Sequence, residues 1–492
     1  MYLRAGTILR TNLSVPKFGT NRTAEVAGWL VLFAAGGLVY WFAQANNTWG
    51  WITAFVVALF LVVIFGICWE WALTRRAPAN SRNAILVGIL FWLLLDPLLW
   101  REGIDEFSPD VIVRALLYAG IFIAALCAGY LVPPFSGVKR FFYRMPSEPK
   151  DDRIFWVTVA IYLFGIVPQI YVSGGSPIEF WHLLLAGYSP DIEVGWRRGM
   201  LGNPDDFLKS TAHLLELCVP FLGVYLVRRQ LVPWKKLLLV LMMLSIFLII
   251  FFSGERRVFA LIVLGPLFYV FLVTAKATRR KLTPVFLAGA LVLFWMMQAQ
   301  VQFRSAGFYD FDPAVVQTNP LEMHRDNNFY WFATAVDTMP SMYEFTNEWV
   351  FLQIFTHPIP RFLWPAKPFT VGLPFVQWDE IGASLSLSIV GELYVSQGLT
   401  GIILGGLLYG WMAKNWDQLR AYFSQSQAIS LIYSLGLTLL LIGVRSFGDI
   451  VLNWYVLLIV ILALRFSGQR VRSKQWYGPA GSAKLSRSGA ML

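Results

Sequence analysis

Long apolar runs separated by short polar segments dominate the chain. A helix needs about 20 apolar residues to cross the hydrocarbon layer of a bilayer. About twelve runs approach that length, and they lack the alternating pattern of transmembrane β-strands. Because backbone in lipid must satisfy its own hydrogen bonds, the runs are predicted to be membrane-spanning α-helices. Their approximate ranges are 26–43, 51–73, 84–100, 110–132, 154–172, 211–227, 237–252, 258–274, 282–299, 388–412, 428–444 and 450–464.

The polar segments between these runs divide the predicted all-α membrane protein into five parts. Most connections are short, so the two long ones, which lie on the external side, are where function is expected. Two aromatic stretches in the longer loop, 329–336 and 349–355, are too short to span and are predicted to lie on or dip into the outer interface. The parts are a leader (1–25), spans one to nine (26–300) with an external loop (173–210), a large external loop (301–387), spans ten to twelve (388–464) and a tail (465–492).

Composition agrees with this architecture and excludes a soluble globular enzyme. The chain is 57% hydrophobic and 14% charged. Its net charge of +11 would suit nucleic acid, but in a membrane protein Lys and Arg mainly set orientation. With the N-terminus inside, the cytoplasmic segments hold 28 of these residues and the external segments 11. Both termini are therefore predicted to be cytoplasmic. The cysteines all fall inside predicted spans and indicate neither disulfides nor a metal site.

The external positive charge is mostly arginine. Arginine binds phosphate oxygens through two parallel hydrogen bonds and stays charged at low dielectric, so the set favours an anionic substrate such as a lipid-linked diphosphate. Contact with lipid headgroups or pairing with external acids is the alternative for any single residue. The set is Arg101, Arg197, Arg198, Arg256, Arg257, Arg304, Arg325, Arg361 and Arg445, beside Lys209 and Lys367.

Three of the external segments hold their cations in restricted positions. Residues 253–257 form a tight predicted hairpin that presents Arg256 and Arg257 at the membrane surface. Arg304 directly follows the ninth span, after glutamines that suggest a wet cavity. The segment 358–368 contains four prolines, which stiffen the backbone around Arg361 and Lys367. A rigid backbone under a cationic pair favours a binding site over a spacer.

Candidate acid–base groups are few. Glu392 enters the outer end of the tenth span, where an acid is costly and indicates function, either as a catalytic base or as the partner that holds an arginine. His357 and His324 lie in the long loop, and His357 is the stronger candidate base. Asp310 and Asp312 have a spacing seen in metal-dependent sugar transferases, but two carboxylates are a weak signal and no metal site is predicted.

Together these features resemble the Wzy-type oligosaccharide repeat unit polymerases of O-antigen and exopolysaccharide assembly. The resemblance rests on Ser-Gly-X-Arg at 253–256, the arginine after the ninth span, Pro-Arg-X-X-Trp-Pro-X-Lys-Pro at 360–368, and Gly-Glu at 391–392 followed by Gly398 and Gly401. It is strongest over 237–412. It implies a multi-pass glycosyltransferase of the GT-C type in the bacterial inner membrane, acting on the periplasmic side without a cofactor.

The resemblance also implies substrates and roles. The substrates would be oligosaccharide repeats on undecaprenyl diphosphate, and the partners membrane lipids, a flippase and a chain-length regulator, with no nucleic acid. The departing diphosphate would be stabilised by arginines, first Arg256, Arg304 and Arg361, then Arg257, Lys367 and Arg445. Glu392, followed by His357, would act on the acceptor hydroxyl.

Two other functions fit the same pattern. An O-antigen ligase, which transfers finished glycan to a lipid A core, shares the span number, external loop and arginines, and the two loop histidines favour it. A flippase or exporter of the lipid-linked oligosaccharide would need ionisable groups deep in its spans and repeated halves. No repeat is evident, and the few such groups are Asp96, Arg114, His213 and Glu216.

Overall fold

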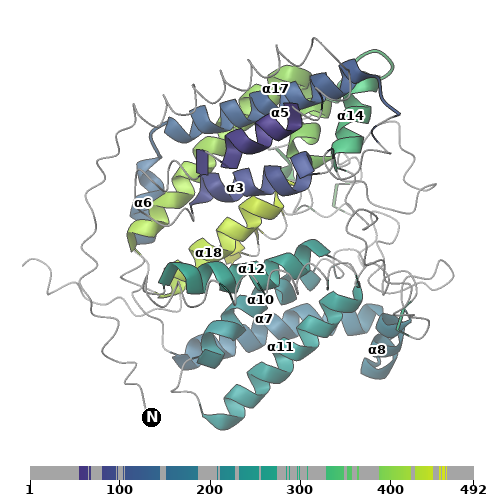
Figure 1. Ribbon diagram of the computed structural model, residues 1–492. Coiled ribbons are helices and arrows are strands. Elements are labelled where there is room, and N and C mark those ends of the chain that lie inside the picture. Colours follow the sequence, from purple (N-terminus) through teal and green to yellow (C-terminus); the bar gives the residue numbers. More distant parts are fainter. Residues whose placement is uncertain are drawn as a thin grey trace, which may run out of the picture.

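The chain folds into packed α-helices, as seen in a computed structural model (Figure 1). The structure describes residues 80–95, 106–143, 151–186, 211–227, 232–253, 256–273, 328–347, 387–422 and 427–446, together with short pieces, chiefly within 52–67, 352–364 and 451–462. The predicted span 26–43 lies wholly outside the described residues and 282–299 largely outside them, while 450–464 is described only in part.

Four described helices are long and apolar enough to cross a membrane, and each coincides with a predicted span. The chain is therefore a multi-pass, all-helical membrane protein, as its hydropathy predicts, while the total of about twelve spans stays a prediction. The four helices are α5 (Pro109–Leu131), α7 (Asp151–Val172), α11 (Pro233–Ser253) and α17 (Ser388–Trp416).

Shorter helices complete the described fold. Several coincide largely with predicted spans: the helix Phe55–Ile64, α3 (Ser81–Ile89), which continues as the π-helical segment η2 (Leu90–Leu94), α10 (Ala212–Val227), α12 (Arg256–Val273) and α18 (Gln427–Ile442). The others lie in the predicted connections: α6 (Ser136–Tyr143), α8 (Pro177–Leu185), α14 (Asn328–Thr338), α15 (Gln353–Thr356) and η5 (Asp417–Tyr422). The loop 173–210, which is predicted to be external, thus contains a helix that hydropathy did not predict.

Close packing of α5 against α17 forms the centre of one helix group. The two helices run parallel, because Tyr118 stacks on Tyr394 and, further along both, Gly129 meets Leu407. A Cβ at Gly129 would lie 2.0 Å from the Leu407 carbonyl oxygen, and one at Gly410 would lie 2.0 Å from that of Leu126. Small residues at these positions let the backbones approach, as membrane helices commonly require.

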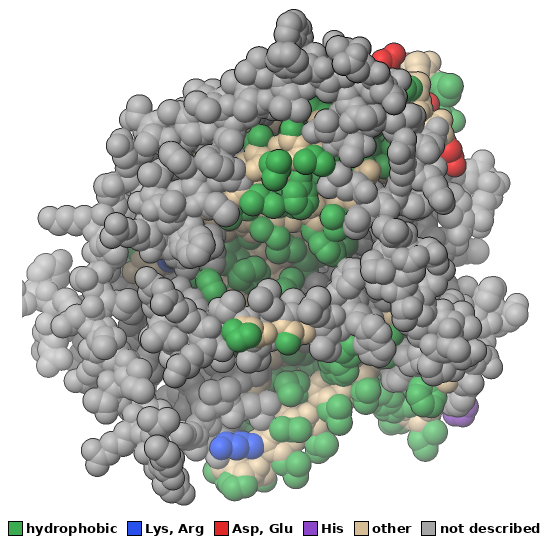
Figure 2. Space-filling model, in the orientation of Figure 1, with side chains coloured by type: hydrophobic (Ala, Val, Ile, Leu, Met, Phe, Trp, Pro, Cys, Tyr) green, Lys and Arg blue, Asp and Glu red, His purple; other side chains and the backbone are tan. Residues whose placement is uncertain are grey.

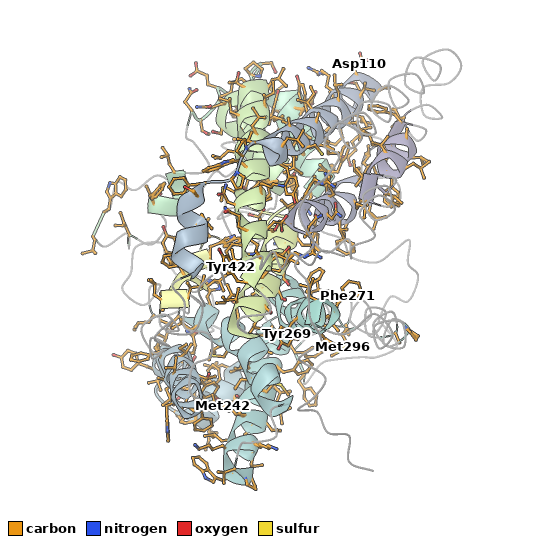
Figure 3. All side chains as sticks on the ribbon, turned by 90° about the vertical axis from the view of Figure 1, so that its left-hand side faces the viewer. Asp110, Met242, Tyr269, Phe271, Met296 and Tyr422 are labelled. Carbon is orange, nitrogen blue, oxygen red and sulfur yellow. The ribbon has the colours of Figure 1, made fainter. Side chains whose placement is uncertain are left out.

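Helix α18 runs antiparallel to α17 and joins this group to a second one. It packs against α3 on one side and α12 on the other, and α12 contacts α10 and α11. In Figure 1, α5, α17, α14 and α3 therefore lie above α18, while α12, α10, α7 and α11 lie below it. Figure 3 shows the same order from the side, with Asp110 of α5 at the top, Tyr269 of α12 lower and Met242 of α11 near the bottom.

Asp417 ties four elements together at one end of the first group. Its carboxylate accepts hydrogen bonds from the backbone N–H of Ser81 (3.0 Å) and the Ser81 hydroxyl (2.7 Å), which begin α3. The hydroxyl of Tyr433 on α18 donates at 2.6 Å, and that of Tyr130 on α5 donates to the other oxygen. We call this the Asp417 end. Four donors satisfy the carboxylate, so it acts as a structural junction.

The outer faces of the second group are apolar and exposed. On α7, Phe164 and Tyr171 are 72% and 68% exposed, and on α11 Leu237 is 61% exposed. Figure 2 shows hydrophobic side chains along the lower part of the molecule, where α11 lies in Figure 1. Such surface is stable only against lipid or another protein, which agrees with a membrane location.

Candidate functional site

The tenth predicted span is broken near its middle. Within α17, Gln397 and Gly398 have non-helical dihedral angles, with φ of 60° and ψ of −144° at Gly398. That region is accessible almost only to glycine, and a Cβ there would lie 2.8 Å from the Phe345 ring. Hydropathy predicts one continuous helix here. The structure instead has a short first half, 388–396, that carries Glu392.

A segment of the long loop satisfies the backbone groups that the break exposes. The N–H of Thr346 donates to the Val395 carbonyl at 3.0 Å, and that of Asn347 donates to the Ser396 carbonyl at 2.9 Å. Irregular backbone at membrane depth is tolerated only where it is buried in protein or lines a wet cavity. The loop and the half-helix therefore form one structural unit, which fixes the position of Glu392.

Glu392 is buried at this end of α17, with 5% of its surface exposed. Oε1 accepts a 2.7 Å hydrogen bond from the hydroxyl of Ser446, which lies just beyond the end of α18. The N–H of Ile389 donates to the Val444 carbonyl at 2.9 Å, so the turn after α18 is bound at two points to the half-helix. We call this region the Glu392 end. The half-buried Arg445 sits in this same turn.

Helix α14 packs on the half-helix through aromatic side chains. Phe332 lies edge-on to Tyr394, with ring centroids 6.2 Å apart, and the Tyr394 hydroxyl donates to the Met339 carbonyl at 3.0 Å. Phe329 and Phe332 are fully buried. The sequence predicts a helix here lying on or dipping into the membrane interface. The helix is present, but its apolar face packs on α5 and α17, so protein and not lipid covers it.

The Glu392 end and the start of α12 lie on the same side of the membrane. In the second group, Gln169 near the end of α7 bonds to Thr211 before α10, and Phe155 near its start contacts Trp234 near the start of α11. The end of α7 therefore lies beside the end of α11 and the beginning of α12.

The link between the groups sets their relative orientation. Helix α6 is held at the Asp417 end, because Gln418 donates to the Phe135 carbonyl just before it. Only residues 144–150 connect α6 to α7, a span of at most about 29 Å, too short to cross a bilayer with its headgroups. The start of α7 is therefore on the Asp417 side. Figure 1 agrees, with α6 on the left and both α14 and α8 on the right.

Of the predicted site residues, Glu392 is bonded through Ser446 to the turn that also holds Arg445. Arg256 and Arg257 begin α12 on the same membrane side, and their side chains lie outside the described part. The predicted site residues Arg304, Arg361, Lys367 and His357, and the alternative base His324, lie outside the described residues. No group of three or more His, Cys, Asp or Glu that could hold a metal occurs among the described residues.

A second buried acid lies on the Glu392 side, in α10. His213 Nδ1 is 2.7 Å from Glu216 Oε1, and the two side chains are 15% and 4% exposed. The sequence marks both as ionisable residues in a span and does not pair them with each other. Residues three positions apart on a helix lie side by side, so this spacing is the sequence signal that could have predicted the pair.

Comparisons with protein-family models, with curated proteins and with solved structures found no match. The class that the fold defines is a multi-pass helical membrane protein with a broken span.

Proposed function

We propose that the protein polymerises oligosaccharide repeat units carried on undecaprenyl diphosphate, on the periplasmic face of the bacterial inner membrane. The observation that carries the proposal is the buried Glu392 in a broken membrane helix, bonded to the turn that holds Arg445. The resemblance in 237–412 supplies the reaction type, and the described residues support a site on one membrane face.

The leaving group is the chemical problem that the arginines would solve. As the anomeric carbon of the growing chain is attacked, its C–O bond to the diphosphate breaks and the electron pair leaves with the lipid diphosphate. Arg256 and Arg257 open α12, whose first turn holds no acid, and the single carboxylate of Glu255 just before them cannot balance both charges. Two cations at the positive end of a helix dipole are unfavourable unless an anion neutralises them. This supports diphosphate binding by these residues, with Arg445 on the same side.

We assign Glu392 the second of its two sequence-derived roles. It is buried, and its Oε1 is engaged by Ser446, so it is better suited to hold the Arg445 turn than to meet a sugar hydroxyl. On this proposal, Glu392 positions a cation for the diphosphate, and the acceptor hydroxyl is activated elsewhere.

The broken helix also suits a second candidate, a transporter of the same lipid-linked oligosaccharide. Transporters place substrate and coupling ions at interrupted spans, where unwound carbonyls act as ligands. Here the carbonyls of Val395 and Ser396 already accept hydrogen bonds from Thr346 and Asn347. This favours a rigid break over an ion site, and we rank transport second.

The test uses the purified full chain in nanodiscs, with lipid-linked repeat units as the sole substrate and glycan length read on a gel. Wild type should give a ladder of bands, each longer by one repeat unit. Arg445→Ala and Arg256→Ala should abolish this ladder. Lys236→Ala, which removes a cation near the start of α11 on the opposite membrane side, is the matched control and should keep the ladder. No ladder without a lipid A core acceptor, but transfer with one, would establish the ligase. Inertness in both assays, with substrate crossing the bilayer, would establish a transporter.

A further inference from the structure

The described carboxylates in the helical core differ in how many hydrogen bonds they accept. Asp417 accepts four, from Ser81, Tyr130 and Tyr433, and is fully used by the fold. Glu216 has one oxygen, Oε1, on His213, and its buried Oε2 has no hydrogen-bond partner among the described residues. A buried acid that the fold does not satisfy is costly, so its retention calls for another reason.

The geometry of the pair gives that reason. If Glu216 acts as an ionised carboxylate, which only accepts hydrogen bonds, Nδ1 of His213 donates in the 2.7 Å contact and Nε2 is the basic nitrogen. Oε2 receives no donor among these residues, so within the described part of the chain the imidazole is the one hydrogen-bond partner found for the carboxylate. Glu216 is 4% exposed while His213 is 15% exposed, so the acid is sealed and the imidazole reaches the surface. This is the arrangement of a general base with a buried orienting carboxylate.

We propose that His213 is the catalytic base that activates the acceptor sugar hydroxyl, and that Glu216 is its positioning residue. The proposal rests on the polymerase function given above, which does not assign the base that activates the acceptor hydroxyl. In the step, the hydroxyl oxygen forms the new bond to the anomeric carbon as its O–H bond breaks. The proton goes to Nε2 of His213, and the bond to the diphosphate breaks with its electrons leaving on the diphosphate.

Placement agrees with this role. His213 is the second residue of α10, on the membrane side that also holds Glu392 and the start of α12. The elements packed on α10 bring charged residues to this side from α12 and from the turn after α18, while α7 brings the uncharged Gln169. By sequence, the charged and titratable residues that flank these elements on this side are Lys209, Glu255, Arg256, Arg257 and Arg445.

The experiment measures the pH dependence of ladder formation in nanodiscs for wild type, His213→Asn and Glu216→Gln. His213→Asn should lower the rate about 100-fold or more, the range for loss of a general base, while the apparent KM changes little. Glu216→Gln should move the acidic limb of the profile to lower pH, because the imidazole then binds its proton less tightly. Ser245→Ala, which breaks a polar contact to Tyr162 within the same helix group, should change neither. If Glu216→Gln does not fold, Glu216→Asp replaces it.

The outcomes separate the two proposals. A wild-type ladder with wild-type rates and pH profiles in both variants would overturn the base assignment and leave the polymerase standing. A lower rate with an unmoved acidic limb would show a structural role and also overturn the assignment. Absence of a ladder from folded wild type would overturn the polymerase, and this inference with it.

Discussion

The Ser446 hydroxyl donates a 2.7 Å hydrogen bond to the buried Glu392 carboxylate, across the gap between α18 and the first half of α17. The two residues are 54 positions apart in sequence. Ser446 lies in the turn after α18, and Arg445 is the residue directly before it. A movement of this turn would therefore alter the hydrogen bond to Glu392 and shift Arg445 at the same time.

Ser446→Ala should lower the free energy of unfolding by about 1–3 kcal/mol, because it removes a donor to a buried charged acceptor. Thermal unfolding in detergent measures the change, with Ser245→Ala as the control for loss of a neutral contact. The double variant Ser446→Ala with Glu392→Gln should cost less than the sum of the single variants, because both remove the same bond. Additive effects would show that the bond contributes nothing in solution.

Gly398→Ala should destabilise the broken span and reduce ladder formation. The residue would be forced into a region that costs about 1–3 kcal/mol for a side chain, and its Cβ would meet Phe345. The companion variant Gly398→Ala with Phe345→Ala removes the steric contact but not the dihedral strain. Full recovery of the unfolding temperature in that double variant would assign the effect to the ring and contradict a strained backbone.

Hydropathy predicted the long helices well because the requirement to cross lipid leaves a strong signal in about 20 consecutive residues. It did not predict the break in α17. Glycine is common in membrane helices, and the signal for a break at Gly398 lies in residues 345–347, which are far away in sequence. The helix α8 was missed for another reason, since its apolar run is too short to separate from a loop.

The candidate site was predicted only in part, for a similar reason. An acid entering a span indicates function by its cost alone, so Glu392 could be singled out. Its partner Ser446 could not be singled out, because a serine just after a span has no distinguishing feature. His213 and Glu216 were noticed as charges in a span, but only their 2.7 Å contact and the buried oxygen of Glu216 suggest a pair with a role.

Tyr330 should ionise at higher pH than an ordinary tyrosine. Partial burial raises its pKa above the usual 10.0, and so does the hydrogen bond that its hydroxyl donates to the Glu106 carboxylate, which also repels the phenolate. The folded state therefore favours the neutral phenol. This stabilisation is present below pH 10.0 and is lost as the pH rises through the raised value. Subtracting the tyrosinate absorbance titration of Tyr330→Phe from that of wild type isolates the group.

Glu106→Gln is the matched variant for that titration. It removes the carboxylate and leaves the partial burial in place, so the midpoint for Tyr330 should fall toward 10.0 without reaching it. An unchanged midpoint would show that the contact between α14 and the residues before α5 does not form in solution. Exposed acidic side chains gather where these segments lie, at the upper right of Figure 2, so the titration should be run at more than one salt concentration.

Asp417→Asn should be among the most destabilising single changes in the described helices. The amide cannot accept all four hydrogen bonds, and its N–H groups would face hydroxyl and backbone donors from Ser81, Tyr130 and Tyr433. Leaving several such donors unsatisfied should cost about 3 kcal/mol or more. The control is Tyr162→Phe, which removes one neutral contact to Ser245 and should cost about 1 kcal/mol.

Because Asp417 lies at the opposite end from Glu392, a folded Asp417→Asn protein at low temperature should still lengthen glycan. Equal unfolding temperatures for the two variants would contradict the junction, and loss of activity in folded Asp417→Asn protein would show that the two ends are coupled.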